Sequence, residues 1–206
     1  MGSGEPELRY LDRFCPRHGL AVDVGAHHGH YSYRLSKLCP SVVAFEINAD
    51  LLADLRSYNA GNIRVIPEGL SANLADVTLL IPMVDGRSFT GWASLYPDNL
   101  PGATSHTVKH ARVTTLDAFH FDDVTFMKID VEGHELEVLK GAEQTLARCH
   151  PTLLIEVKAA NLSEVQQFLA IYEYTQCRLL DLIGIQGSAE NIIFLPPNQP
   201  LHGVAV

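Results

Sequence analysis

The sequence predicts an α/β fold in which a mostly parallel β-sheet is covered by helices on both faces. Strand-like and helix-like segments alternate from one end of the 206-residue chain to the other. The strand-like segments are short, apolar and rich in β-branched residues, which is typical of strands buried on both faces. The chain is 47% hydrophobic and contains no internal repeat, so we expect a single domain spanning 1–206.

The first part of the chain contains three predicted strands and two predicted helices. The strands are expected at 19–26, 41–48 and 62–71, and the helices at 30–39 and 49–61. In the second helix Leu51, Leu52, Leu55 and Tyr58 recur at helical spacing, and Gly61 suits the position after a helix. A further strand is expected at 75–83.

The segment 82–112 interrupts this alternation. It is rich in Gly, Pro, Ser and Asn, shows no clear period, and contains Trp92, the one tryptophan of the chain. Irregular segments of this length inside compact domains are usually functional or disordered. We therefore expect a substrate loop or lid, whose aromatic side chains either cover a pocket and stack on a ligand or form a small core that holds the loop. The residues considered for these roles are Phe89, Trp92, Tyr96, His106 and His110.

The second part of the chain resumes the strand–helix alternation. Strands are expected at 111–119, 124–130, 151–157, 174–184 and 189–196, and helices at 135–149, interrupted at Gly141, and at 162–172. Four acids stand at predicted strand ends: Asp23, Glu46, Asp130 and Glu156. Because ligands bind beyond the carboxyl ends of parallel strands, we expect these acids to converge on one rim of the sheet.

Charge and cysteine usage narrow the possible partners. The net charge is −9, from 24 acids and 15 bases, and no basic tract is present, which disfavours a nucleic-acid partner. No apolar run approaches the roughly 20 residues that span a bilayer. The four cysteines are scattered without a C-x-x-C pair, which favours reduced thiols and a cytoplasmic protein.

The stretch from Asp23 to Gly29 predicts a ligand-binding turn between a strand and a helix. Only Gly25 and Gly29 are glycines, so the dinucleotide pattern G-x-G-x-x-G and the phosphate-binding loop are both absent. Glu46 follows Asp23 by 23 residues, which suits an acid that accepts hydrogen bonds from ribose hydroxyls. A ribose without a phosphate indicates S-adenosylmethionine. The alternative is a tight turn without a ligand.

The sequence resembles the FkbM family of S-adenosylmethionine-dependent methyltransferases over most of its length. The resemblance lies in "VDVGAHHGHYS", "VVAFEIN" and above all "VTFMKIDVEGHELEVLKGAEQTL", followed by "PTLLIEV". It implies a Rossmann-like methyltransferase fold with a seven-stranded sheet and, usually, O-methylation of sugars, glycans or natural products. The family commonly has Asn where His27 stands and Pro where Ile47 stands.

Carried onto this chain, the resemblance implies five positions that bind the cofactor and one that lies near its methyl group. Asp23, Gly25 and Gly29 would form the cofactor turn, Glu46 would hold the ribose, and Ser71 would lie near the adenine. Asp130 would stand at the end of the fourth strand, near the methionine moiety and the methyl group.

Transfer of a methyl group to an alcohol benefits from a general base, and several rim residues are candidates. His134 suits proton transfer at neutral pH, although a surface histidine at a helix start is the alternative. Asp130 and Glu156 are the other catalytic candidates, or they chelate Mg²⁺ as a divalent metal. Glu132 has an alternative as an acid that favours a helix N-terminus.

The function we expect is O-methylation of a small hydroxylated acceptor, such as a sugar, a glycan or a glycosylated natural product. Two other functions stay open at this point. One is a methyltransferase for a protein or lipid acceptor, and the other is a non-catalytic module that binds the cofactor.

Overall fold

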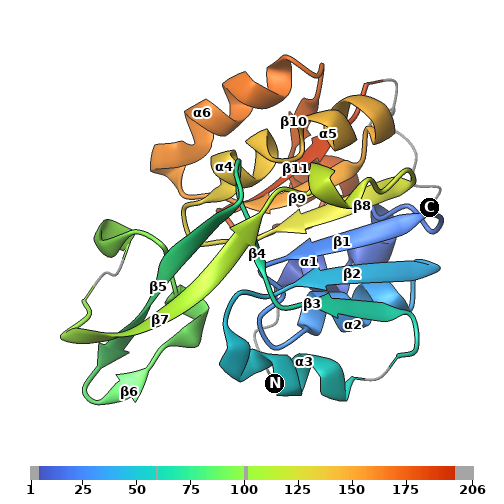
Figure 1. Ribbon diagram of the computed structural model, residues 1–206. Helices are drawn as coiled ribbons and strands as arrows, with labels where there is room; N and C mark the ends of the chain where they lie inside the picture. Colours follow the sequence, from blue (N-terminus) through green and yellow to red (C-terminus); the bar gives the residue numbers. More distant parts are fainter. Residues whose placement is uncertain (1–4, 59, 100–101, 198–206) are drawn as a thin grey trace.

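The computed structural model describes residues 5–58, 60–99 and 102–197. The predictions for 1–206, 49–61 and 82–112 also include residues 1–4, 59, 100–101 and 198–206, which lie outside the described residues. Figure 1 shows a central sheet between two layers of helices, with a smaller sheet that projects to one side.

The central sheet has seven strands and confirms the predicted α/β architecture. Its order is β10-β11-β9-β8-β1-β2-β3, and all neighbouring strands are parallel except at β11, which is antiparallel to both β9 and β10. The strands are β1 (Leu20–Val24), β2 (Ser41–Phe45), β3 (Ile63–Ile66), β8 (Val124–Ile129), β9 (Thr152–Glu156), β10 (Thr175–Cys177) and β11 (Asn191–Leu195).

Helices cover both faces of this sheet (Figure 1). The helices are α1 (Pro6–Arg9), α2 (His30–Ser36), α3 (Leu52–Ser57), α4 (Glu135–Lys140), α5 (Glu143–Cys149), α6 (Ala159–Ala170) and α7 (Leu179–Ile183). Successive strand residues enter different cores: Met127 packs in the cluster that includes Leu139 and Val165, whereas Phe126 packs with Leu35. This period of two is the reason why the strands are apolar throughout. Among the described residues, no helix has the length and apolarity to cross a membrane.

A second sheet contains the strand predicted at 75–83 and extends into the region where the sequence predicted a long loop. Its order is β4-β7-β5-β6, with strands β4 (Gly69–Leu70), β5 (Ala75–Val84), β6 (Arg87–Ser88) and β7 (Ser105–Thr114). Strands β5 and β7 form an antiparallel hairpin from the pair Ala75–Val113 to the pair Met83–Ser105. We call residues 75–114 the hairpin lobe. Short 3₁₀ turns at Thr90–Trp92 and Pro97–Asn99 lie between its long strands.

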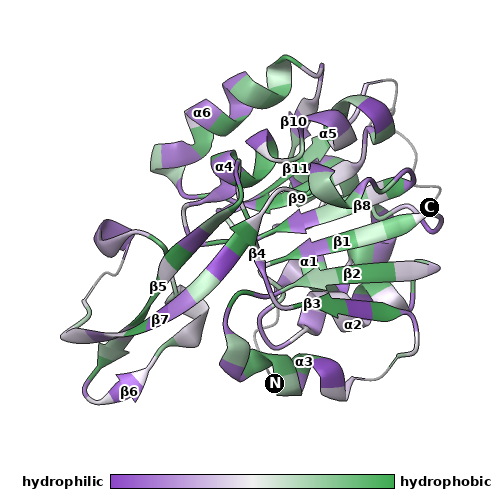
Figure 2. Ribbon diagram, in the orientation of Figure 1, coloured by the Kyte–Doolittle hydropathy of each residue, from purple (hydrophilic) through white to green (hydrophobic). Residues whose placement is uncertain are grey.

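The prediction of an irregular loop over 82–112 was therefore wrong at both ends. Residues 82–84 belong to β5 and residues 105–112 belong to β7. Most of β7 is exposed, so its sequence has polar residues where a buried strand would have apolar ones. Figure 2 shows this contrast: the central strands are coloured mainly as hydrophobic, whereas β7 is mixed. Strand pairing with β5, rather than burial, forms this element.

Two expectations for the second half of the chain have different outcomes. The predicted interruption at Gly141 is confirmed, since α4 ends at Lys140 and α5 begins at Glu143. A Cβ atom at Gly141 would lie 1.9 Å from the carbonyl oxygen of Ser71, so only glycine lets these segments approach. The predicted strand 174–184 was wrong beyond Cys177. Residues 179–183 form α7, which ends at Gly184 with a left-handed φ of 71°.

Candidate functional site

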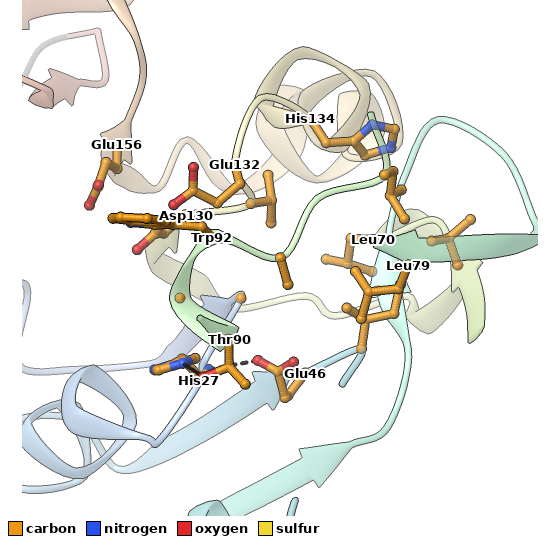
Figure 3. A pocket seen from close by; sticks show the side chains of 18 of the residues that line it. His27, Glu46, Leu70, Leu79, Thr90, Trp92, Asp130, Glu132, His134 and Glu156 are labelled. Atoms are coloured by element: carbon orange, nitrogen blue, oxygen red, sulfur yellow. Dashed lines mark hydrogen bonds between the residues drawn. The ribbon is translucent and has the colours of Figure 1, made fainter. Parts of the chain in front are cut away.

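The strand order brings the four predicted acids to the carboxyl end of the sheet. Strands β2, β1, β8 and β9 are consecutive neighbours, so Glu46, Asp23, Asp130 and Glu156 follow one another along the rim. Glu46, Asp130 and Glu156 line a pocket of about 330 Å³. Asp23 and Asp130 line an adjoining pocket of about 310 Å³, and both pockets share Gly25 and His27. Figure 3 shows the larger pocket.

The turn after β1 needs glycine for a close approach to β8. Gly25 has a φ of 78°, and a Cβ atom there would lie 1.8 Å from the carbonyl oxygen of Asp130. Gly29, also left-handed, lines neither pocket; a Cβ atom there would lie 2.5 Å from Leu55 Cδ1. Gly25 therefore shapes the pocket wall, whereas Gly29 lets α2 begin against α3.

Asp23 is fully buried under this turn. Its Oδ2 atom accepts a 2.5 Å hydrogen bond from the Ser32 hydroxyl in α2. Burial raises the pKa of the Asp23 carboxyl to about 6, although the Ser32 hydrogen bond and the Lys128 charge act in the opposite direction. The side chain of Asp23 therefore ties the glycine turn to the first helix after it.

Glu46 presents a buried carboxylate to the larger pocket. Its Oε2 accepts from the backbone N–H of His27 at 2.7 Å, and its Oε1 accepts from the backbone N–H of Asn48 at 2.6 Å. Burial raises the pKa of Glu46, while these two hydrogen bonds act against the rise. Each carboxylate oxygen retains a further lone pair, so the group can accept two hydroxyl donors from a ligand. The adjacent lining is apolar, from Ile47, Leu70, Leu79 and Val113.

His27 stands where the family commonly has Asn, and its backbone conformation accounts for that preference. Its φ is 50°, in the left-handed region that Asn adopts more readily than most residues. The longer histidine side chain reaches Thr90 of the hairpin lobe, with 3.0 Å between Nε2 and Oγ1. Burial, with the neighbouring His28 as a smaller cause, lowers the pKa of His27. The His27 imidazole therefore links the glycine turn to the lobe.

A buried lysine lies beneath the acids of β8 and β9. Lys128 is 1% exposed, and its Nζ lies 3.6 Å from Glu156 Oε2 and 3.8 Å from Asp130 Oδ2. It also donates to Asn191 Oδ1 at 3.3 Å. Burial, followed by the charge of Asp130, raises the pKa of Glu156 to about 7, and Lys128 opposes that rise. Glu156 is therefore a carboxyl group poised to exchange a proton near neutral pH.

The hairpin lobe holds the turn that follows β8. The carbonyl oxygen of Glu132 accepts from Ser94 Oγ at 2.9 Å and from Asn99 Nδ2 at 3.0 Å. Glu132 itself has a left-handed φ of 52°, and its carboxylate lies 3.0 Å from Lys158 Nζ. Burial raises the pKa of Glu132, and Lys158 acts in the opposite direction.

His134 is engaged through both ring nitrogens. Its Nδ1 lies 2.8 Å from the Tyr96 hydroxyl, and its Nε2 lies 3.0 Å from Ser71 Oγ. Burial lowers the pKa of this imidazole. His134 therefore connects three segments, namely the hairpin lobe, the exit of β4 and the start of α4. Ser71 lines neither pocket, because its hydroxyl is turned to His134.

The hairpin lobe also supplies a wall of the larger pocket that the motifs did not identify. This wall consists of Thr90, Gly91, Trp92, Ala93 and Leu95. Trp92 is 43% exposed, and its ring stacks on Phe89, with ring centroids 5.0 Å apart and an interplanar angle of 13°. Composition alone singled out Trp92, whereas His106 and His110 lie on β7 and line neither pocket.

The sequence also offered Asp130 and Glu156 as possible ligands of a divalent metal. The Lys128 ammonium already lies between the two carboxylates. In the part of the chain that the structure describes, no three His, Cys, Asp or Glu side chains are grouped to hold a metal ion.

Comparisons with known proteins give one family and a set of related folds. The family described as the methyltransferase FkbM domain matches residues 23–179. A comparison with curated proteins gave no match. Among solved structures, the chain is similar to methyltransferase FkbM from Methylobacillus flagellatus KT, with 20% identity and a TM-score of 0.60. That similarity covers 87% of this chain but 44% of the other, so the chain spans less than half of that relative.

Two further solved structures match over nearly their whole length. An rRNA methylase from Streptococcus thermophilus is 13% identical, with a TM-score of 0.53, and the match covers 95% of this chain and 98% of that one. A methyltransferase from Streptococcus mutans in complex with SAH is 14% identical, also with a TM-score of 0.53, and the match covers 95% and 99%. Identities this low establish a shared fold alone.

Proposed function

The chain belongs to the FkbM methyltransferase family, and from that premise we propose that it methylates a hydroxyl of a small acceptor, using S-adenosylmethionine. The acceptor class we favour is a sugar, a glycan or a glycosylated natural product. The observation that carries this proposal is the buried Glu46 carboxylate, which faces the same pocket as Gly25 and Asp130.

The residues present fit this cofactor. The carboxylate of Glu46 is held by two backbone N–H groups and suits the paired hydroxyls of a ribose. The apolar side chains beside it, among them Ile47 and Leu70, suit a flat adenine ring. Gly25 and Asp130 line both pockets, so a long ligand can extend from one to the other.

Bound S-adenosylmethionine supplies a methyl group on a positively charged sulfur. Asp23 keeps the glycine turn in place through Ser32, and Asp130 lies where the two pockets meet and favours positive charge there. The hairpin lobe forms one wall of the pocket on the acceptor side through Trp92 and Ala93.

Glu156 is the general base in this proposal. Its carboxylate lines the larger pocket, and its pKa of about 7 matches the pH at which proton transfer is efficient. The acceptor hydroxyl loses its proton to a carboxylate oxygen of Glu156, and Lys128 stabilises the carboxylate form. His134, the other candidate, has both nitrogens in hydrogen bonds, so we assign it the role of joining the lobe to α4.

The proposed location is the cytoplasm, where thiols stay reduced. Cys15, Cys39, Cys149 and Cys177 are all free in the structure.

The proposal is tested in two steps. Isothermal titration with S-adenosylmethionine and with S-adenosylhomocysteine measures cofactor binding, and absence of heat with both would overturn the proposal. Incubation with methyl-labelled cofactor and fractionated extract then shows whether label enters a small-molecule fraction. Label in protein or lipid would mean that the acceptor is a protein or a lipid and not a small molecule. Cofactor binding without any methyl transfer would indicate a non-catalytic module.

A further inference from the structure

The half of the larger pocket over β8 and β9 has features that restrict what can bind beside the cofactor. Given the proposed function, on which this inference rests, the cofactor lies over β1 and β2, where Gly25 and Glu46 stand. The acceptor then lies over the neighbouring strands β8 and β9. Its surroundings are Asp130, Glu132 and Glu156 on the sheet side and Trp92 on the lobe side (Figure 3).

Trp92 offers an open aromatic face at this place. Its ring lines the pocket while 43% of the residue stays exposed, so the protein itself leaves part of the ring uncovered. Parallel stacking on Phe89 fixes the ring orientation. An indole face binds the C–H side of a saturated ring, and it also attracts a cation more strongly than the other aromatic side chains do.

The charge of the lining is one-sided. Four acidic side chains line the pocket outside the ribose position, from Glu5, Asp130, Glu132 and Glu156, and no lysine or arginine among the described residues lines it. Glu156, with its pKa raised to about 7, is only partly ionised at neutral pH. The two lysines that pair with these acids, Lys128 and Lys158, do not line the pocket.

The two histidines of the lining do not offset this charge. Burial lowers the pKa of both His27 and His134, which favours their neutral forms. A phosphate or carboxylate group on the acceptor would therefore meet several like charges and no cationic partner, whereas a protonated amine would be attracted.

We propose that the acceptor is a hydroxylated saturated ring that carries a protonated amine, as in an amino sugar, and that it stacks on Trp92 with its amine toward Glu132. The side chain of Glu132 is the carboxylate to which the amine binds, because the proposed function assigns Glu156 to the acceptor proton and Asp130 to the cofactor side, and Glu5 already accepts from the Tyr31 hydroxyl. Lys158 Nζ lies 3.0 Å from Glu132 Oε2, so the amine would share this carboxylate with Lys158. The same charges exclude sugar phosphates and uronic acids.

The single tryptophan makes this proposal directly measurable. Trp92 is the one tryptophan of the chain, so all tryptophan emission reports on the proposed subsite. The protein is first loaded with S-adenosylhomocysteine, and the loading is verified by titration calorimetry. Methyl glycosides of gluco, galacto and manno configuration are then titrated at pH 7 as matched amine, neutral and 6-phosphate forms.

The expected result is that at least one amine form changes the emission and binds at least tenfold more tightly than its neutral counterpart. The 6-phosphate forms should not bind, and the preference for the amine should shrink as salt screens the charges. If the neutral or phosphorylated form binds as tightly as the amine, the inference is overturned. It is also overturned if no probe changes the emission of cofactor-loaded protein, while the proposed function stands because the cofactor has bound.

Two variants with matched controls separate the ring from the charge. Glu132→Gln should remove the preference for the amine, whereas Glu164→Gln makes the same charge change on an exposed part of α6 and should not. Trp92→Leu should abolish probe binding in calorimetry while cofactor binding stays, and Val108→Ala, an exposed apolar position on β7, should change neither. Retention of the amine preference in Glu132→Gln would contradict the assignment.

Discussion

Lys128 Nζ lies 3.6 Å from Glu156 Oε2, on two parallel strands that are direct neighbours in the central sheet. The lysine is buried, whereas the glutamate reaches the pocket. The pair therefore couples a charge inside the protein to a carboxyl group that a ligand can touch. Since the ammonium favours the ionised carboxylate, Lys128 sets how readily Glu156 accepts a proton.

Glu156→Gln should remove the general base with little change in shape. We expect turnover in the identified acceptor fraction to fall by about 10²- to 10⁴-fold. In the unmodified enzyme turnover should rise with pH around a midpoint of about 7, because Glu156 must be deprotonated to accept the proton. The Gln variant should lack this rise. A pH–rate profile of both proteins decides the matter, and a Gln variant that keeps the midpoint would exclude Glu156 as the base.

Lys128→Met should move that midpoint to higher pH. Methionine keeps an unbranched chain but lacks the charge that lowers the pKa of Glu156, so we expect an upward shift of about 1 unit. Lys140→Met is the matched control, since Lys140 pairs with Glu137 at an exposed position outside the pocket. The same pH–rate measurement applies, and an unchanged midpoint in Lys128→Met would show that the buried ammonium does not act on the base.

His134→Ala should weaken acceptor binding rather than abolish chemistry. The variant loses the hydrogen bonds to Tyr96 and Ser71 that hold the lobe, so we expect KM for the acceptor to rise about threefold to tenfold. The pH midpoint of turnover should stay near its original value. Tyr96→Phe breaks the same connection, so the double variant should be no worse than the stronger single variant. If His134→Ala lost turnover while Tyr96→Phe kept it, His134 would again be assigned as the general base.

The rim of the sheet was predictable because its signals are local. Asp23, Glu46, Asp130 and Glu156 each follow an apolar run, and the alternation of strands and helices places such ends together. The same holds for the break at Gly141, where a glycine interrupts a helical pattern.

The contacts of the segment between β8 and α4 were not predictable, because each joins residues far apart in the chain. Tyr96 meets His134 across 38 positions, and Ser71 meets it across 63. Lys158 reaches Glu132 across 26 positions, so Glu132 could be read only as an acid near a helix start. These pairs exist because the hairpin lobe, the exit of β4 and the start of α6 all meet the segment after β8, and no local pattern records those contacts.

Glu46→Ala should weaken cofactor binding without unfolding the sheet. Hydrogen bonds from ligand hydroxyls to a charged acceptor contribute about 1.5–3 kcal/mol, so we expect the Kd for S-adenosylhomocysteine to rise by at least tenfold. Calorimetric titration measures this, and Glu164→Gln serves as the control for removal of an acid at an exposed position. An unchanged Kd would mean that the ribose does not contact Glu46.

Gly25→Ala should lower stability more than Gly61→Ala, although both glycines have nearly the same backbone conformation. Their φ values are 78° and 77°, so the added cost of a left-handed alanine, about 1–2 kcal/mol, applies equally to both. A Cβ atom at Gly61 meets nothing within 4 Å, whereas at Gly25 it would lie 1.8 Å from the Asp130 carbonyl oxygen. Moving the backbone of β1 away from β8 should cost a further ~1–3 kcal/mol, and it should also displace Asp130 from the junction of the two pockets. Urea unfolding of the two variants measures the difference, and titration with S-adenosylhomocysteine should show that only Gly25→Ala loses affinity. If the two variants were destabilised equally, the turn after β1 would have room for a Cβ atom beside β8. Gly25 would then be needed only for its left-handed backbone conformation.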